Sequence, residues 1–261
     1  MARSLRPTKL AALLLSGACA CALAFGPAEA NARAKPSFAQ GKKGGVLRID
    51  GSRRADDVVA GCDEAGVVTL NGAQIEAGEG LLACDRVVEV DVLVGGGNDF
   101  VDLRGVTDDA FGKARYAGFG RGTATYVSAG SGSDRVFGGA RAFNQVRGDQ
   151  GNDRIETGSR RDEVSGGPGN DSIATGAGPD VVLAAAGRDR VRAGYGADIV
   201  NGGPDDDRLF GNDGDDRLGG WTGDDYLNGG RGNDYLVGGP GRNRIVRGPG
   251  KDRVVASNRR G

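Results

Sequence analysis

Histidine is absent from this sequence of 261 residues, and it is the side chain most used for acid–base chemistry near neutral pH. Its absence excludes a Ser-His-Asp triad, a Cys-His dyad and an HExxH zinc site. The sequence also lacks GxSxG, P-loop and GxGxxG motifs. Catalysis by carboxylates alone, as in glycosidases, stays open because Asp and Glu are abundant. On balance we expect a protein that is not an enzyme.

Bulky side chains are scarce as well. Aromatic residues make up 5% of the chain, and Met and Trp occur once each. Glycine occurs 50 times, against a usual frequency of about 7%. A chain of this composition cannot build an ordinary globular core, so it must be either disordered or built from repeats.

The first thirty residues have the composition of a secretory signal peptide. Three basic residues within the first nine positions precede an apolar stretch over 10–25, and Ala28-Glu29-Ala30 supplies a small-residue cleavage site. We therefore expect cleavage after residue 30 and a secreted, extracellular protein. A membrane anchor fits less well because the apolar stretch is shorter than about 20 residues. A lipid anchor on Cys19 is a further alternative.

Removal of this segment takes away three of the 34 basic and one of the 35 acidic residues, so the mature chain carries a formal charge of −3. This balance gives no reason to expect nucleic acid or an anionic membrane as a partner. Cys62 and Cys84 remain as a pair in an oxidising compartment, which favours a disulfide over two buried thiols.

Aspartate recurs every nine residues over the second half of the chain. Thirteen consecutive positions, here called anchors, keep this register without an insertion, and only two of them carry Asn. The residue two places after every anchor is aliphatic, and the residue two places before it is Gly in ten of the thirteen repeats. The anchors are Asn144, Asp153, Asp162, Asp171, Asp180, Asp189, Asp198, Asp207, Asp216, Asp225, Asp234, Asn243 and Asp252.

One aliphatic residue in nine cannot form an amphipathic helix, which needs apolar residues every three or four positions. It suits a very short strand that points one side chain inward and its two neighbours outward. The glycines before it suit a turn, because Gly alone enters positive φ without a steric penalty. Two strands and two turns then make a coil of eighteen residues, and stacked coils make two parallel sheets around a thin aliphatic core.

Two segments match the nonapeptide GGxGxDxUx at every specified position, GGPGNDSIA at 166–174 and GGRGNDYLV at 229–237. The sequence thereby resembles the repeats-in-toxin (RTX) group, the haemolysin-type calcium-binding repeat proteins. The resemblance runs continuously over 139–255, with earlier copies at 94–102 and 129–137. It implies an all-β fold, a right-handed parallel β-roll (β-solenoid) preceded by an N-terminal β cap.

Stacking brings anchor carboxylates two repeats apart into line, roughly 4.8 Å from one another. Two such charges repel by about 3 kcal/mol at an effective dielectric constant of 20, so a row of them requires a cation. Oxygen ligands in flexible geometry favour Ca²⁺ over Mg²⁺ or Zn²⁺. The family resemblance implies that Asp carboxylates of two stacked turns and carbonyls of the glycine-rich positions hold it. The expected metal residues are Asp99, Asp134, Asp153, Asp171, Asp180, Asp189, Asp198, Asp207, Asp216, Asp225, Asp234, Asp252, Gly178, Gly196, Gly214 and Gly232. The alternative is that these aspartates only form turns.

The anchors divide between two edges of the roll. One edge carries Asp180 and every second anchor up to Asp252, each with Gly two places earlier, and we expect it to be the better occupied metal column. The other edge is patchier, since Asp205 replaces a glycine and Asn243 closes the row. Calcium should also couple to folding, because the aliphatic core is thin for the length of the chain.

Arginine is more frequent than is typical of the family. Arg154, Arg190, Arg208 and Arg244 directly follow anchors on one sheet, and Arg217 and Arg253 do so on the other. These side chains either neutralise nearby aspartates or form a basic face for an acidic polysaccharide. Two functions therefore remain: a non-enzymatic calcium-binding module, structural or adhesive outside the cell, and a carbohydrate-active or acidic-polysaccharide-binding extracellular protein, with a cell-surface component as a possible partner.

The remaining chain divides by pattern. After the signal peptide at 1–30, residues 31–93 begin with a polar, flexible stretch and continue as strand-like runs that we expect to cap the roll, pinned by Cys62–Cys84. Residues 94–138 hold the first repeats and an irregular insertion over 103–128, where Phe111, Tyr116, Phe119 and Tyr126 indicate either a packed excursion or degenerate coils. Residues 139–255 form the calcium-binding roll, and 256–261 a tail.

Overall fold

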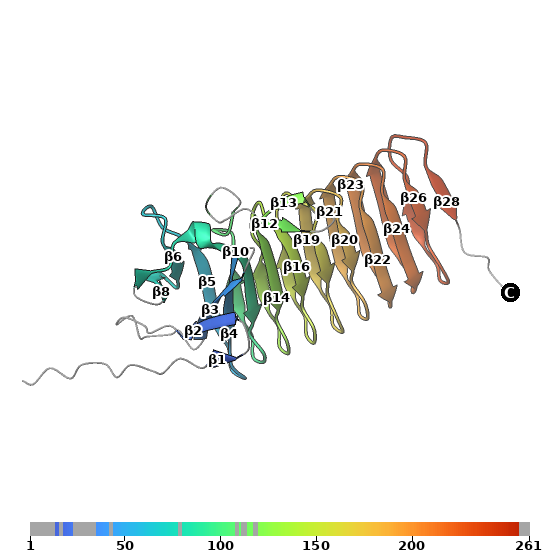
Figure 1. Ribbon diagram of the computed structural model, residues 1–261. Helices are drawn as coiled ribbons and strands as arrows, with labels where there is room; N and C mark the ends of the chain where they lie inside the picture. Colours follow the sequence, from blue (N-terminus) through green and yellow to red (C-terminus); the bar gives the residue numbers. More distant parts are fainter. Residues whose placement is uncertain are drawn as a thin grey trace, which may run out of the picture.

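The computed structural model is an all-β solenoid in which coils stack along one axis (Figure 1). It describes residues 14–15, 18–22, 35–41, 44–77, 80–107, 110, 114–116 and 120–255. Most of the expected signal peptide, Phe111, Phe119 and the tail at 256–261 lie outside the described residues. The signal peptide stays a prediction.

The first of the two main sheets, sheet A, has 13 strands within the described residues. From β4 onward its strands are parallel, whereas β1, β2 and β3 are antiparallel additions at its N-terminal edge. In spatial order it comprises β1 (Leu14–Leu15), β2 (Ala18–Ala22), β3 (Lys35–Gly41), β4 (Gly44–Asp50), β10 (Val87–Leu93), β14 (Ala124–Ser128), β16 (Phe143–Arg147), β18 (Glu163–Ser165), β20 (Val181–Leu183), β22 (Ile199–Pro204), β24 (Arg217–Thr222), β26 (Tyr235–Val237) and β28 (Arg253–Val255).

The second, sheet B, has 11 strands in the part of the chain that the structure describes. It is parallel from β27 back to β5, where β6 and β7 continue it in antiparallel fashion. In spatial order it comprises β27 (Arg244–Val246), β25 (Tyr226–Arg231), β23 (Arg208–Asp213), β21 (Arg190–Tyr195), β19 (Ser172–Ala177), β17 (Arg154–Glu156), β15 (Arg135–Phe137), β11 (Phe100–Asp102), β5 (Asp57–Cys62), β6 (Val68–Leu70) and β7 (Ala73–Gln74). The described residues also include two hairpins and one 3₁₀ helix. The hairpins pair β8 (Glu76–Ala77) with β9 (Gly80–Leu81) and β12 (Ala114–Tyr116) with β13 (Gly120–Gly122), and the helix is η1 (Cys84–Arg86).

The strand register confirms the predicted coil of eighteen residues. Ile173 of β19 pairs with Val191 of β21, and Val182 of β20 pairs with Val200 of β22. The chain alternates between sheet A and sheet B at each turn, so consecutive nine-residue repeats lie on opposite sheets. The predicted parallel β-solenoid is therefore correct.

The core is the predicted aliphatic column. Its members from Val146 to Leu236 are at most 3% exposed, and only the last two, Ile245 and Val254, are partly exposed. Each contributes roughly 1.5–3 kcal/mol when fully buried. Because a coil supplies only two such side chains, the core of the roll is narrow.

The N-terminal region forms the first coil of the solenoid and also covers the N-terminal end of the stack. β4 and β5 already run parallel to β10 and β11, so they form a first coil within the segment predicted as a cap. The antiparallel neighbours β3 and β6 cover the open edges of these two strands. Covering both edges prevents further strands from pairing there. If the signal peptide is removed, β3 becomes the outer strand of sheet A.

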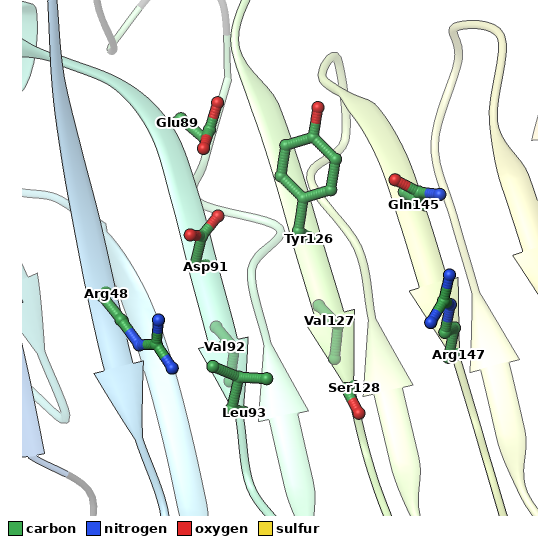
Figure 2. Close-up of a pocket in the computed structure, with 10 residues that line it drawn as sticks. All are labelled: Arg48, Glu89, Asp91, Val92, Leu93, Tyr126, Val127, Ser128, Gln145 and Arg147. Atoms are coloured by element: carbon green, nitrogen blue, oxygen red, sulfur yellow. The ribbon is translucent and has the colours of Figure 1, made fainter.

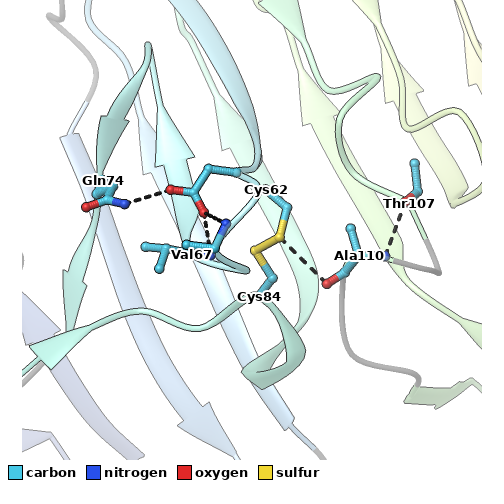
Figure 3. Close-up of a disulfide and its surroundings, with 8 residues drawn as sticks. Cys62, Val67, Gln74, Cys84, Thr107 and Ala110 are labelled. Carbon is cyan, nitrogen blue, oxygen red and sulfur yellow. Dashed lines mark hydrogen bonds between the residues drawn. A yellow bond between two sulfur atoms is a disulfide. The ribbon is translucent and has the colours of Figure 1, made fainter.

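The disulfide joins Cys62 at the end of β5 to Cys84 of η1, as predicted, with the two Cα atoms 6.1 Å apart (Figure 3). It fixes the covering segment to the first coil. The carboxylate of Asp63 supports the same loop by accepting hydrogen bonds from the backbone N–H of Val67 at 2.9 Å and from the side-chain amide of Gln74 at 2.7 Å. The carbonyl oxygen of Ala110, from the insertion, lies 3.8 Å from the sulfur of Cys62.

Replacing both cysteines with serine should destabilise the covering segment and leave the roll intact. Closure of a loop of this length contributes about 3 kcal/mol through the entropy of the unfolded chain. Urea unfolding at saturating calcium, with hydrogen exchange to locate the change, measures the effect. Added reductant should not alter the variant further, and unchanged exchange in residues 63–86 would contradict the assignment.

The insertion leaves the coil after β11 and returns at β14. Leu103 and Val106 are fully buried where it departs, and the β12–β13 hairpin forms its middle. The repeat frame resumes because Ala124 of β14 pairs with Phe143 of β16. In the described residues the insertion thus lies between β11 and β14, and 124–128, which the sequence placed in the insertion, belong to the coil strand β14.

Candidate metal sites in the turns

The anchor aspartates form two hydrogen-bonded ladders, one along each edge of the solenoid. In each ladder Oδ1 of an anchor accepts the backbone N–H of the anchor in the preceding coil. Asp180 accepts from Asp162 at 2.8 Å, and Asp198 accepts from Asp180 at 2.8 Å. On the opposite edge Asp171 accepts from Asp153 at 2.8 Å. These bonds fix one carboxylate oxygen of every anchor between two coils.

The second carboxylate oxygen has no partner. Oδ2 is buried and accepts no hydrogen bond in eleven of the twelve aspartates predicted to bind metal, although a buried acceptor normally finds one. The residues concerned are Asp99, Asp134, Asp153, Asp171, Asp180, Asp189, Asp198, Asp207, Asp216, Asp225 and Asp234, and each is at most 3% exposed. A row of unpartnered, buried, acidic oxygens needs a positive charge or a proton.

In several turns an anchor Oδ2 and a backbone carbonyl oxygen both lie on the side of a glycine where a Cβ would project. At Gly211 a Cβ would collide with Oδ2 of Asp216 and with the carbonyl oxygen of Gly229, which belongs to the next coil. The same pair of atoms, an anchor Oδ2 and a carbonyl from the next coil, converges on Gly148 and on Gly166. Each glycine thus leaves room for two oxygen atoms that are both hydrogen-bond acceptors, so neither can donate a hydrogen bond to the other.

The asparagine anchors provide an internal comparison. Nδ2 of Asn243 occupies the place of the aspartate Oδ2 near Gly238, and it donates a 2.8 Å hydrogen bond to the carbonyl of Gly239. In Asn144 the same nitrogen donates to the carbonyls of Gly139 and Ala142, both at 3.1 Å. An amide therefore satisfies this position through the protein alone, whereas a carboxylate does not.

The donor set fits calcium. The ligands would be carboxylate and carbonyl oxygens, which a hard cation of flexible coordination prefers. No group of three or more Asp, Glu, Cys or His side chains able to hold a metal occurs in the described part of the chain, so backbone carbonyls must supply part of any shell. Two coils contribute to each site, and a bound ion would therefore link them.

Comparison with known families agrees with this geometry. The family description RTX calcium-binding nonapeptide repeat matches in four copies, at residues 119–140, 147–182, 183–218 and 219–254. This chain is an RTX-repeat protein. The match spans the coils whose turns carry the anchors, and calcium is the ion that the RTX family binds. A search among curated proteins gave no match.

Burial controls the ionisation of the RTX anchors. Desolvation raises the pKa of Asp180 and of Asp207 to about 8, and the pKa of Asp171 and of Asp216 to about 7. The backbone N–H that each Oδ1 accepts opposes this rise, and neighbouring aspartates add to it. Without a cation, several anchors would therefore hold a proton near neutral pH.

Calcium-free protein should become less stable as the pH rises from about 5 to about 8. The folded pKa values of these anchors exceed the unfolded value of about 3.9, so the folded state binds more protons across this window. Saturating calcium should reverse the trend, because the ion competes with those protons. Thermal unfolding in metal-free buffers at four pH values tests this, and a midpoint that rises with pH without calcium would contradict it.

Four anchors depart from the pattern, and one of them is Asn144, whose amide is satisfied as described above. Oδ1 of Asp162 accepts from the backbone and side-chain amides of Asn144 at 2.9 and 2.8 Å, and Oδ2 accepts from the N–H of Gly158 at 3.2 Å. This carboxylate is satisfied by the protein. Asp252 lies in the last described coil, where Oδ1 accepts from Asp234 at 3.0 Å and the side chain is partly exposed. Asn243 closes the other ladder through its amide.

The glycines two places before the anchors have a stacking role. Gly196, Gly214 and Gly232 adopt positive φ of 137°, 144° and 135°, and a Cβ on each would strike the carbonyl of the corresponding glycine in the preceding coil. Gly178 takes the same conformation at 129°. Their carbonyls face the next coil, and their predicted role as metal ligands stays a prediction.

The residue five places before each anchor ranks the two edges differently from the ranking predicted above, which used the glycines two places before the anchors. On the edge predicted to be better occupied, Thr175 and Ala193 stand there in the Asp180 and Asp198 turns, and Gly appears only at Gly211 and Gly229. The Thr175 hydroxyl donates to the carbonyl of Ala193 at 2.8 Å. The opposite edge has Gly at this position in the turns of Asp153, Asp171, Asp207 and Asp225. Occupancies in a calcium-soaked crystal decide between the two rankings.

Two groups of residues with a role in the turns were not predicted from the sequence. Asp56 is 2% exposed, its N–H donates to Oδ1 of Asp99 at 2.7 Å, and its own Oδ1 is buried without a partner, so it is an anchor of the first coil. A second, interrupted ladder runs outside the first, formed where the residue before an anchor is Asn or Asp. Asn170, for example, accepts the N–H of Arg188 at 2.8 Å. The Asn-Asp pairs that recur in the repeats are the sequence pattern from which this second ladder could have been predicted.

Replacing Gly211 with alanine should remove a calcium site by displacing the two oxygens that face this glycine, since the φ of Gly211 itself allows a side chain. Gly211 is not among the residues with positive φ, and the added methyl group would occupy the space between the two oxygens. We expect about one calcium ion fewer per chain by equilibrium dialysis. Gly80→Ala is the control because a Cβ there meets nothing within 4 Å. Unchanged stoichiometry in Gly211→Ala would place the ions elsewhere.

Proposed function

We propose that this chain is a secreted calcium-binding β-roll protein without enzymatic activity, which has a structural or adhesive role outside the cell. The observation that carries the proposal is the row of buried, unpartnered Oδ2 atoms facing carbonyls of the next coil. The N-terminal pattern of a signal peptide and the disulfide support an extracellular, oxidising setting. No helix in the described residues is long and apolar enough to cross a membrane.

Calcium would act here as a cross-link between coils. Bound calcium supplies a positive charge that neutralises the turn carboxylates. The chain holds one oxygen of each anchor in place through the ladder hydrogen bonds and directs the other toward the ion. Extracellular calcium then favours the ordered roll, and calcium-poor cytoplasm favours the loose chain before export.

Expression in a secreting host tests the proposal directly. We expect the processed chain in the medium, starting after residue 30, and its attachment to the surface of the producing cells to require calcium. Intact mass and N-terminal sequencing identify the mature form. A chain that stays inside the cell, or whose distribution ignores calcium, would overturn the proposed role.

A second candidate function is binding of an acidic polysaccharide, favoured by a groove along the edge of sheet B. This groove has a volume of about 870 Å³. Arg190 lies over the ring of Phe210 at 5.4 Å, and Arg244 lies over Tyr226 at 5.5 Å, so aromatic rings hold the guanidinium groups in place. Its arginines are Arg188, Arg190, Arg208, Arg242 and Arg244.

The charge of this groove depends on the metal sites. Five aspartates also line it, of which Asp189, Asp207 and Asp225 are buried anchors. Calcium on these anchors would offset their charge and leave five arginines against Asp206 and Asp224. A polyanion would then find a net positive groove only on the calcium-loaded protein.

Binding to alginate or pectate tests this candidate. We expect calcium-dependent binding that weakens as salt is added, with at least a tenfold loss in the double variant Arg190→Gln, Arg208→Gln. The control is Arg217→Gln, Arg253→Gln on sheet A. Release of new reducing or unsaturated ends would show a carbohydrate-active protein, and binding that is indifferent to the groove arginines would exclude this surface.

A further inference from the structure

A separate groove crosses the outer face of sheet A near the N-terminal end of the roll (Figure 2). It has a volume of about 460 Å³, which is within the range of small-ligand sites. It lies over β4, β10, β14 and β16, where the first coils of the roll stack, and away from the arginine groove of sheet B.

Strand pairing places its side chains in two rows across the sheet. Asp91 is the register partner of both Arg48 and Tyr126, and Tyr126 pairs onward with Gln145. Four neighbouring strands carry this row, which therefore spans about 14 Å. In the second row Leu93 pairs with Ser128, and Ser128 with Arg147. Figure 2 shows these side chains projecting from the same face of the sheet.

The groove presents donors and acceptors of both signs. Arg48 and Arg147 are hydrogen-bond donors only, and the carboxylates of Glu89 and Asp91 are acceptors when ionised. Arg48 already donates one hydrogen bond, at 2.9 Å, to Asp50 beside the groove. Together these four groups have no formal net charge. The ring of Tyr126 and the 37% exposed side chain of Leu93 add apolar surface between them. Such a lining does not select an ion.

Asp91 is the unsatisfied member of this set. Its Oδ1 is buried and has no hydrogen-bond partner. Burial raises the pKa of Asp91 to about 6, the charge of Glu89 and a side-chain hydrogen bond with Glu89 add to this rise, and the charge of Arg48 opposes it. The group therefore gains from a hydrogen-bond donor that reaches it, and backbone amides of the sheet cannot serve because the strands on both sides already pair with β10.

We propose that this groove binds a short, uncharged oligosaccharide. Vicinal hydroxyl groups both donate and accept, so they can satisfy the carboxylates and the guanidinium groups together. The apolar face of a sugar ring packs against an aromatic ring such as Tyr126, which is held edge-on by Phe143 at 6.3 Å between ring centroids. A peptide strand would need an open sheet edge, and this groove lies on a sheet face.

The test uses the calcium-loaded full chain and a panel of uncharged trisaccharides made of glucose, mannose, galactose or N-acetylglucosamine. Titration calorimetry should find at least one that binds, with less than a twofold change between low and high salt. Tyr126→Ala and Asp91→Asn should each weaken binding at least tenfold. Tyr235→Ala, on the same sheet outside the groove, is the matched control and should bind like the parent.

Asp91→Asn keeps the size of the side chain, so it guards against loss of folding in Tyr126→Ala, and calcium binding is measured in every variant. Retained calcium binding with no trisaccharide bound at millimolar concentration would overturn this inference and leave the proposed calcium function intact. Equal affinity in parent, Tyr126→Ala and Asp91→Asn would also overturn it, as would a preference for uronate over uncharged sugars.

Discussion

Chelation of calcium is expected to remove much of the β-sheet circular dichroism of the mature chain at neutral pH, leaving a calcium-free roll of low stability. Each site filled at 100 times its dissociation constant contributes about 2.7 kcal/mol to the folded state. Several sites together then contribute on the order of 10 kcal/mol, comparable with the whole stability of a typical domain, about 5–15 kcal/mol. The roll has little else to rely on, since each nine-residue repeat buries a single aliphatic column residue.

Far-ultraviolet circular dichroism with EGTA, followed by calcium in excess, measures this loss and its reversal. Magnesium at the same concentration is the control, because it demands a more regular oxygen shell and gives up its water reluctantly. An unchanged β-sheet spectrum in EGTA would show that the solenoid does not depend on the metal.

Asp216→Asn should change stability in opposite directions with and without calcium. The amide retains Oδ1, which accepts from the N–H of Asp198 at 2.9 Å, and its nitrogen can donate to the nearby carbonyl of Gly229. Without calcium the variant should therefore be more stable than the parent, as the self-satisfied Asn243 indicates. With calcium it should lose roughly one site, or about 2.7 kcal/mol at 100 times the dissociation constant.

Asp162→Asn is the matched control for this experiment. Its carboxylate already accepts hydrogen bonds at both oxygens, so no free oxygen is lost when it becomes an amide. Urea unfolding with EGTA and with calcium compares the two variants. Parallel shifts of Asp216→Asn in both conditions, or equal calcium loss in Asp162→Asn, would contradict the assignment of Oδ2 as the metal ligand.

The repeat frame made the solenoid predictable. Val182 and Val200 stand eighteen residues apart in the sequence and pair directly in sheet A, so spacing alone identified the coil. The disulfide followed from there being one cysteine pair in the expected mature chain. Both inferences needed only local pattern and chemistry, because a coil touches mainly its two neighbours.

Details of the turns could not be obtained in this way. Spacing does not reveal which carboxylate oxygen accepts the hydrogen bond from the preceding coil, and in Asp216 this oxygen is Oδ1, which leaves Oδ2 without a partner. The role of Gly211 depends on a carbonyl from another coil, eighteen residues away. Asp56 was missed because Arg54 replaces the usual glycine before it, and only strand pairing shows that β5 belongs to the roll.

Equilibrium dialysis of the mature chain against millimolar radioactive calcium tests the central claim most directly. The structure predicts several ions per chain, because unpartnered oxygens recur along both edges, and fewer ions as the pH falls through the raised pKa values of the anchors. A folded chain that binds no calcium would contradict the account, since the buried carboxylates would then be stabilised by protons alone.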